Sequence, residues 1–207
     1  CGTMCVAPAY RGQGVSNKLF ELHMDLASNN QCKQLFLEVI KSNDRAVKFY
    51  EKYDYRPVYT LKYYSIMKSS LLSDAGTLNY TLKEIPFDTV DSFRRSLYDC
   101  HINWQSDTPS YAGSANEVFL CAYDGNKKAA LIAMSPQGKI NLIWVGHEYR
   151  NQGLGRSMLQ KAAQMQNIEK VGICLPSNAS IEGFLRKLGF EKQSIEQYEM
   201  YLPLQKC

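Results

Sequence analysis

One short motif occurs twice in this sequence, and the repeat limits the possible folds more than any other feature. Residues 11–16 read Arg-Gly-Gln-Gly-Val-Ser, and residues 150–155 read Arg-Asn-Gln-Gly-Leu-Gly. A short apolar run at residues 140–145 precedes the second motif, as in a buried strand, and apolar residues recur at helical spacing after both motifs. Each motif is therefore predicted to be a tight turn between a strand and a helix.

A second shared pattern follows each turn and its helix. Residues 34–40 and 171–175 have strand character, and each run is followed by a helical segment that begins at an asparagine, Asn43 or Asn178. The spacing from that asparagine to the aromatic residue that closes the segment is the same in both places. Two patterns that recur in the same order at near-constant spacing indicate an internal duplication.

The chemistry of such a turn favours an anion. A strand-to-helix turn points unpaired backbone N–H groups and the positive end of the helix dipole at one spot, which suits a phosphate. The second turn is not a Walker A loop, because Arg156 and Ser157 follow it without the required lysine. It is not a Rossmann fingerprint either, because Met158 stands where the third glycine would be. A turn with a purely structural role is the alternative.

What the turns do fit is the pattern Arg/Gln-x-x-Gly-x-Gly/Ala. With it, both copies resemble the second half of a GNAT acetyltransferase domain, whose pyrophosphate turn binds acetyl-CoA. Ser16 stands where that family has glycine or alanine. The resemblance implies an α/β fold, the acyl-CoA N-acyltransferase fold, with a mixed twisted sheet flanked by helices and duplicated in one chain. Acetyl-CoA is then the co-substrate, with its pantetheine arm between two splayed central strands.

The resemblance also implies which residues contact the co-substrate. They lie on the strand before each turn, in the turn itself, and at the asparagine that opens the next helix. In the first copy these residues are Met4, Cys5, Val6, Arg11, Gly12, Gln13, Gly14, Val15, Ser16 and Asn43. In the second copy they are Ile143, Trp144, Val145, Arg150, Asn151, Gln152, Gly153, Leu154, Gly155 and Asn178.

The two copies differ in how much sequence precedes the turn. We expect residues 1–68 to form the C-terminal half of a first GNAT domain, residues 69–77 to be a linker, and residues 78–207 to form a complete second domain. The first copy has no counterpart of the strands that precede the second turn. Because half a sheet leaves a strand edge unpaired, we expect the N-terminal strands of the first copy to be truncated, disordered or supplied by another chain.

Acetyl transfer to an amine needs a base for the amine proton and an acid for the leaving thiolate. Around Glu38 and Tyr50 the first copy, with Leu-Glu-Val and Phe-Tyr-Glu, resembles the ribosomal-protein N-terminal acetyltransferases. In that family the matching glutamate is the general base and the matching tyrosine the general acid, so the resemblance implies Glu38 and Tyr50 as catalytic residues. The matching residues of the second copy, Ile173 and Leu185, cannot transfer a proton.

Structural explanations stand beside these assignments. Glu38 could instead be a strand-end carboxylate in a salt bridge with Lys41 or Arg45, and Tyr50 could be a core aromatic residue. Other residues have weaker claims: Tyr198 as a substitute acid in the second copy, Cys5 as an acetyl carrier or a packed thiol, and His101, Trp104 and Tyr111 as lining for the acceptor.

Composition excludes several classes of function. The chain has 207 residues, a net charge of +4 and no run of basic residues, which argues against a nucleic-acid or membrane partner. No apolar stretch is long enough to span a membrane. The 7 cysteines are odd in number and scattered, so we expect reduced thiols in a cytoplasmic protein. His23 and His147 have no third ligand nearby in the sequence, so no metal site is expected.

Together these observations predict a tandem GNAT acetyltransferase. We expect it to move an acetyl group from acetyl-CoA to a primary amine, of a small molecule or a peptide, by direct attack in a ternary complex. A CoA-binding regulatory or scaffolding protein without turnover is the main alternative, and thioester hydrolysis or transfer of a longer acyl group is a third. A homodimer is possible, and nothing in the sequence identifies the amine.

Overall fold

The eight strands in the described part of the chain form one continuous sheet. The computed structural model describes residues 4–73, 80–98 and 100–204. The strands are β1 (Gln34–Ile40), β2 (Arg56–Met67), β3 (Thr81–Glu84), β4 (Val118–Asp124), β5 (Lys127–Met134), β6 (Lys139–Val145), β7 (Lys170–Pro176) and β8 (Glu191–Pro203). Their order across the sheet is β1-β8-β2-β7-β6-β5-β4-β3. Only β6 and β7 pair in parallel, so the predicted mixed sheet is confirmed.

Helices cover the sheet and connect its strands. The α-helices are α1 (Val15–Asn29), α2 (Asp44–Glu51), α3 (Lys68–Leu72), α4 (Phe87–Ser96), α5 (Leu154–Met165) and α6 (Glu182–Lys187). Short 3₁₀ helices are η1 (Pro8–Tyr10), η2 (Trp104–Ser106), η3 (Thr108–Ser110) and η4 (His147–Tyr149). In the described part of the chain, no helix has the length and hydrophobicity needed to cross a bilayer.

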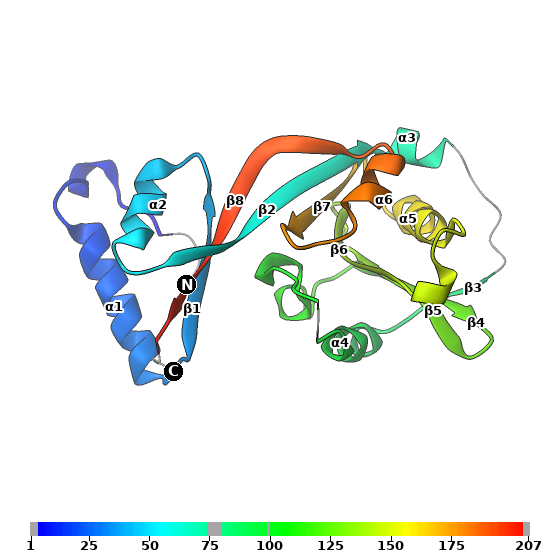
Figure 1. The fold of residues 1–207 in the computed structure, drawn as a ribbon, viewed down its shortest axis with the longest axis horizontal. Coiled ribbons are helices and arrows are strands. Elements are labelled where there is room, and N and C mark those ends of the chain that lie inside the picture. The colour runs from blue at the N-terminus through cyan, green and yellow to red at the C-terminus, as the bar shows by residue number, and fades with distance from the viewer. Residues whose placement is uncertain (1–3, 74–79, 99, 205–207) are drawn as a thin grey trace.

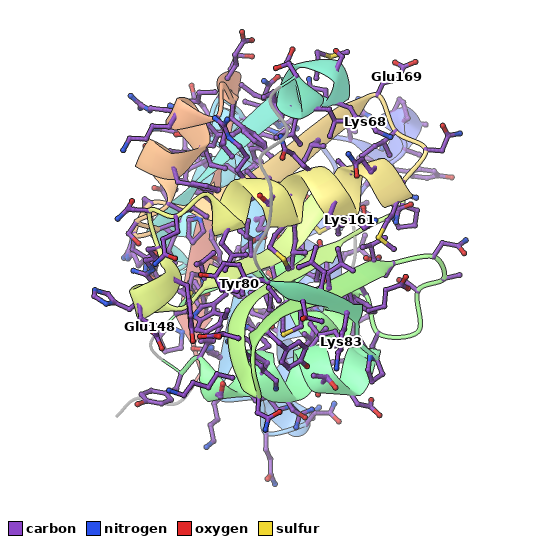
Figure 2. The ribbon with its side chains drawn as sticks, turned by 90° about the vertical axis from the view of Figure 1, so that its right-hand side faces the viewer. Lys68, Tyr80, Lys83, Glu148, Lys161 and Glu169 are labelled. Carbon is purple, nitrogen blue, oxygen red and sulfur yellow. The ribbon has the colours of Figure 1, made fainter. Side chains whose placement is uncertain are left out.

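The second copy has helices on both faces of its sheet. Successive side chains of a strand point to opposite faces, and β5 follows this rule. Ile132 packs in the core cluster that contains α5, whereas Leu131 packs in the cluster that contains Val90 of α4. Figure 2 shows α5 lying across the sheet, with Lys161 on this helix. The arrangement is the predicted sheet flanked by helices.

The helices of the first copy cover only one face of its sheet. Val39 of β1 packs with Phe20 of α1 and with Met200 and Leu202 of β8. The α1 helix keeps an exposed apolar side, where Leu19 is 46% exposed. Met158, at the matching position of α5, is 0% exposed because that helix packs on β4, β5 and β6. In the described residues, β4, β5 and β6 have no counterparts against α1, as expected for a first copy without N-terminal strands.

The closing strands of the two copies are exchanged. The sequence assigns β2 to the first copy and β8 to the second, yet β2 pairs with β7 of the second copy and β8 pairs with β1 of the first. The two exchanged strands also pair with each other and run between the two halves of the molecule (Figure 1). Repeat patterns could not reveal this, because a closing strand has the same alternation whichever copy it joins.

The expected linker is partly helical. Its residues 69–72 belong to α3, where Leu71 is 4% exposed in the core of the second copy. Residues 74–79 lie outside the described residues. The division of the chain near residues 68 and 78 stays a prediction.

Candidate functional site

The two glycine turns have the same backbone conformation. Gly12 and Asn151 occupy matching positions with positive φ values of 76° and 62°. Gly14 and Gly153 follow with φ values of 75° and 81° and form the N-caps of α1 and α5. A residue with a Cβ is strained in this left-handed region, which explains the glycines. The duplication seen in the sequence is therefore also a duplication of geometry.

The motif side chains shape the turn by reaching back to the backbone before it. Both arginines donate to a carbonyl on the preceding strand or segment, and both glutamines donate to a carbonyl four residues earlier. The pairs are Arg11 Nε to Val6 O at 3.0 Å, Arg150 Nε to Val145 O at 3.1 Å, Gln13 Nε2 to Ala9 O at 2.9 Å, and Gln152 Nε2 to Glu148 O at 2.9 Å. In the second copy, Tyr80, labelled in Figure 2, donates to Gln152 Oε1 at 2.9 Å.

The helix ends behind the turns are open to an anion. Neither Gly14 nor Gly153 can supply a side-chain cap, so the first N–H groups of α1 and α5 gain no bond from their N-cap residue. A Cβ built on either glycine meets no atom within 4 Å, which leaves space beside the turn. Backbone donors, a positive helix end and free space together suit a pyrophosphate.

A cavity of about 450 Å³ opens at the first turn. It is lined by Met4, Cys5, Val6, Tyr10, Arg11, Gly12, Gly14, Val15, Ser16, Asn43, Arg45, Ala46, Phe49 and Tyr50. The structure thus brings the residues predicted for the first copy into one cavity, except Gln13. Sequence reasoning missed Tyr10, Arg45, Ala46 and Phe49. Their positions in the sequence could have indicated them, because Tyr10 directly precedes the turn and the other three follow Asn43 in α2.

Asn43 and Asn178 do not play the same part. Asn43 caps α2, and its Oδ1 accepts a hydrogen bond from the backbone N–H of Ala46 at 3.2 Å. The sequence predicts a helix from Asn178 as well, but α6 begins only at Glu182 and has Ile181 as its N-cap residue. Asn178 lies instead in the turn after β7.

The second turn lies at the mouth of a split between two strands. β6 and β7 pair only through Lys139 and Ile140, so Ile143, Trp144 and Val145 lie on the part of β6 that pairs with β5 but not with β7. Splayed strands leave backbone groups free for an extended ligand. Gly155 is buried there, and a Cβ on it would lie 3.0 Å from Phe184 Cζ. The second turn is therefore packed closely against Phe184 of α6, whereas the first turn opens into a cavity.

Glu38 lies on the face of β1 that the helices leave uncovered. Asn103 Nδ2 donates to Glu38 Oε1 at 3.0 Å, and Gln105 Nε2 donates to Glu38 Oε2. Burial raises the pKa of the Glu38 carboxyl above its ordinary 4.5, and the nearby Glu199 raises it further, whereas the Asn103 amide opposes both. The suggested salt bridge with Lys41 is absent, because Lys41 pairs with Glu196 at 3.2 Å. Sequence reasoning did not identify Asn103 or Gln105.

Glu199, a second carboxylate near Glu38, has its own set of polar partners. It is 1% exposed, its Oε2 lies 2.7 Å from His101 Nε2, and its Oε1 accepts a hydrogen bond from the Tyr201 hydroxyl at 2.9 Å. The imidazole of His101 stacks on Tyr59 with ring centroids 4.1 Å apart. A segment of the second copy that contains His101 therefore lies against the sheet of the first, and the role of His101 as lining for the acceptor stays a prediction.

Tyr50 lies on the other side of β1. It lines the cavity and packs with Phe20 and Tyr55 in the first-copy core, and burial raises the pKa of its hydroxyl above 10.0. Glu38 does not line the cavity. Glu38 and Tyr50, the predicted base and acid, thus lie on opposite faces of β1. In the second copy the matching Ile173 and Leu185 are 6% and 0% exposed in the core.

The weaker candidates have ordinary surroundings. Cys5 is an exposed free thiol at the cavity, and Tyr198 packs against the first-copy core with Lys41 Nζ 5.4 Å from its ring centre. Tyr111 packs beneath α4, and Trp104 lies in η2 and is 48% exposed. No group of three potential metal ligands occurs among the residues that the structure describes.

Comparison with known proteins bears on both copies. Residues 1–55 match the profile of the acetyltransferase (GNAT) family, and residues 115–192 match that of an acetyltransferase (GNAT) domain. Among curated proteins, none matches the sequence.

Solved structures share the fold over at least 90% of the chain. A tandem GNAT protein from the clavulanic acid biosynthesis pathway has a TM-score of 0.70 at 14% identity, covering 100% of this chain and 75% of that one. A conserved protein of unknown function from Staphylococcus epidermidis has a TM-score of 0.66 at 14% identity, with 90% and 79% covered. A GCN5-related N-acetyltransferase from Sphaerobacter thermophilus has a TM-score of 0.63 at 16% identity, with 97% and 71% covered.

Proposed function

Because this chain carries two domains of the GNAT acetyltransferase family, we propose that it transfers an acetyl group from acetyl-CoA to a primary amine by direct attack in a ternary complex. The observation that carries the proposal is the cavity at the first turn. It joins an uncapped helix end, which suits a pyrophosphate, to the hydroxyl of the half-buried Tyr50, which suits a leaving thiolate.

The first copy supplies the groups that hold acetyl-CoA. The N–H groups at the start of α1 bind the pyrophosphate, and Gly14 allows its close approach. Arg45 adds a positive charge at the cavity wall. Acetyl-CoA supplies the acetyl group as a reactive thioester.

Two side chains then move the protons. Because Glu38 lies outside the cavity, on the opposite face of β1 from Tyr50, it accepts a proton from the amine nitrogen through an intervening water as that nitrogen forms its new C–N bond to the acetyl carbon. The Tyr50 hydroxyl donates a proton to the sulfur as the C–S bond breaks. Burial suits Glu38 to this task, because a carboxylate with a raised pKa is a stronger base. In the second copy Ile173 and Leu185 leave no such pair, so turnover belongs to the first copy.

A two-step experiment tests this function. Calorimetric titration with acetyl-CoA should show binding, and a thiol-release assay over a panel of small amines and peptides should then show amine-dependent release of CoA. Binding without release for any amine would support the CoA-binding scaffold instead. Release without an amine would indicate thioester hydrolysis.

A further inference from the structure

We propose that the second copy completes the catalytic site of the first, with Asn103 and Gln105 acting as positioning residues that hold the Glu38 carboxylate ionised and correctly turned. This inference rests on the proposed role of Glu38 as the base. It goes beyond that role by assigning a function to a loop that neither glycine turn nor the matched catalytic positions include.

The geometry is a two-point clamp on one carboxylate. Each oxygen of Glu38 accepts one side-chain amide N–H, from Asn103 at 3.0 Å and from Gln105. An ionised carboxylate only accepts hydrogen bonds, so both amides must present nitrogen to it. Two donors from one short segment fix both the position and the plane of the group.

The contact of Asn103 with Glu38 leaves the other polar atom of the Asn103 amide, Oδ1, without a hydrogen-bond partner in the described structure. The residue is 1% exposed, and this Oδ1 is buried. An amide that leaves a buried acceptor unpaired is unfavourable for folding alone. Turning the amide over would place its oxygen against the carboxylate of Glu38. The orientation is therefore explained by the bond from Nδ2 to Glu38.

The loop that carries the clamp is itself anchored to the second copy. Arg94 of α4 forms two bonds with Asp107, from Nε to Oδ1 at 2.9 Å and from Nη2 to Oδ2 at 3.3 Å. Thr108 Oγ1 donates to Asp91 Oδ1, also on α4, at 2.6 Å. Lys139 of β6 donates to the carbonyl oxygen of Gln105. These bonds fix the loop that carries Asn103 and Gln105 to α4 and β6.

The charges around Glu38 explain why a clamp is needed. The titratable groups that face it are Glu199 and Tyr201 of β8, Tyr63 of β2, Lys139 of β6 and Cys174 of β7. Burial and the Glu199 charge favour the neutral acid, which cannot accept the amine proton. Lys139 and the two amides favour the carboxylate. Removing an amide should therefore raise the pKa of Glu38.

The first experiment measures the clamp without catalysis. The chain is labelled with ¹³C at the glutamate carboxyl carbon, and the Glu38 signal is assigned by its loss in Glu38→Gln and titrated by NMR. We expect Asn103→Ala and Gln105→Ala each to raise the pKa of Glu38. The control Ser106→Ala, at a buried hydroxyl without a partner in the same loop, should leave it unchanged. An unchanged Glu38 titration in folded Asn103→Ala or Gln105→Ala would overturn the proposal.

The second experiment asks whether the clamp serves turnover. The acid limb of the kcat/KM profile should move to higher pH in Asn103→Ala, with a loss of about ten- to hundredfold on that limb, because a hydrogen bond to a charged group is lost. Ser106→Ala should keep the wild-type profile. In a Glu38→Gln background Asn103→Ala should cost little more, because it acts through Glu38.

The two experiments separate the two hypotheses. If the NMR titration shifts but the acid limb does not, Asn103 holds Glu38 as inferred, and the proposed role of Glu38 as base is wrong. If Asn103→Ala lowers kcat equally in both backgrounds, it acts without Glu38, and the positioning role is wrong.

Discussion

Glu38 and Glu199 lie directly opposite each other on the antiparallel strands β1 and β8, one carboxylate from each copy. Like charges at such cross-strand positions repel, so each carboxylate needs its own compensation. Glu199 has His101 and Tyr201, and Glu38 has the amides of Asn103 and Gln105. Polar side chains from a loop of the second copy thus cover this face of the first-copy sheet.

The proposed acid and base should dominate turnover. Glu38→Gln and Tyr50→Phe should each lower kcat by about 10²- to 10⁴-fold, the range for losing a positioned acid or base. Steady-state thiol release with the preferred amine measures this. The control Leu185→Ala should instead lower the free energy of unfolding by about 2–5 kcal/mol, because Leu185 is 0% exposed, with kcat little changed. Near-normal turnover in both first-copy variants would refute the assignment.

The half-buried base Glu38 should also reduce stability at neutral pH. Burial raises the folded-state pKa of Glu38 above 4.5, so the folded protein binds this proton more tightly than the unfolded chain. The contribution of Glu38 to the free energy of unfolding is complete below the pKa of Glu38 in the unfolded chain. It is lost as the pH rises through the pKa of Glu38 in the folded protein. Glu38→Gln should therefore have a higher Tm than wild type at pH 7, and the difference should vanish near pH 3. A lower Tm at pH 7 would show that the ionised group is already fully compensated.

The open glycine of the first turn should be needed for the ligand. Gly14→Val places a branched side chain where a Cβ meets no protein atom, so it should obstruct the pyrophosphate. Calorimetry should show loss of acetyl-CoA binding to the first copy, with a stability cost of about 1–2 kcal/mol from the left-handed backbone. Gly125→Val is a matched control, because Gly125 also has positive φ and open space but lies in the β4–β5 turn. Equal binding in both variants would support a purely structural turn.

The His101–Glu199 contact should contribute to the junction between the copies. His101→Leu leaves the Glu199 carboxylate, 1% exposed, with the Tyr201 hydroxyl alone. We expect a loss of about 1–3 kcal/mol in the free energy of unfolding, the cost of a buried group losing a partner. Adding Glu199→Gln should restore part of it, because the uncompensated charge is gone. Urea denaturation of the wild type, the two single variants and the double variant measures the coupling.

The turns were predictable from sequence because their geometry depends on local residue types. Gly14 and Gly153 have positive φ, and the spacing of glycines, arginine and glutamine encodes the whole turn. The clamp on Glu38 was not predictable, because Asn103 reaches it only through tertiary packing and stands in a loop without a motif. The sequence suggested His101 only as lining for the acceptor, and its contact with Glu199 was not predictable, because the register of β1 and β8 depends on the exchange.

The exchange of β2 and β8 has a consequence for how the molecule can come apart. β2 forms its ladders with β7 and β8, and β8 forms its ladders with β1 and β2. Separating the chain into two pieces near residue 74 would therefore remove a central strand from each half and break three ladders at once, β1–β8, β2–β8 and β2–β7. We expect heat or denaturant to melt both copies in one cooperative transition, with the same midpoint for probes placed in α1 and in α5. Two polypeptides split at that point should regain structure only when mixed.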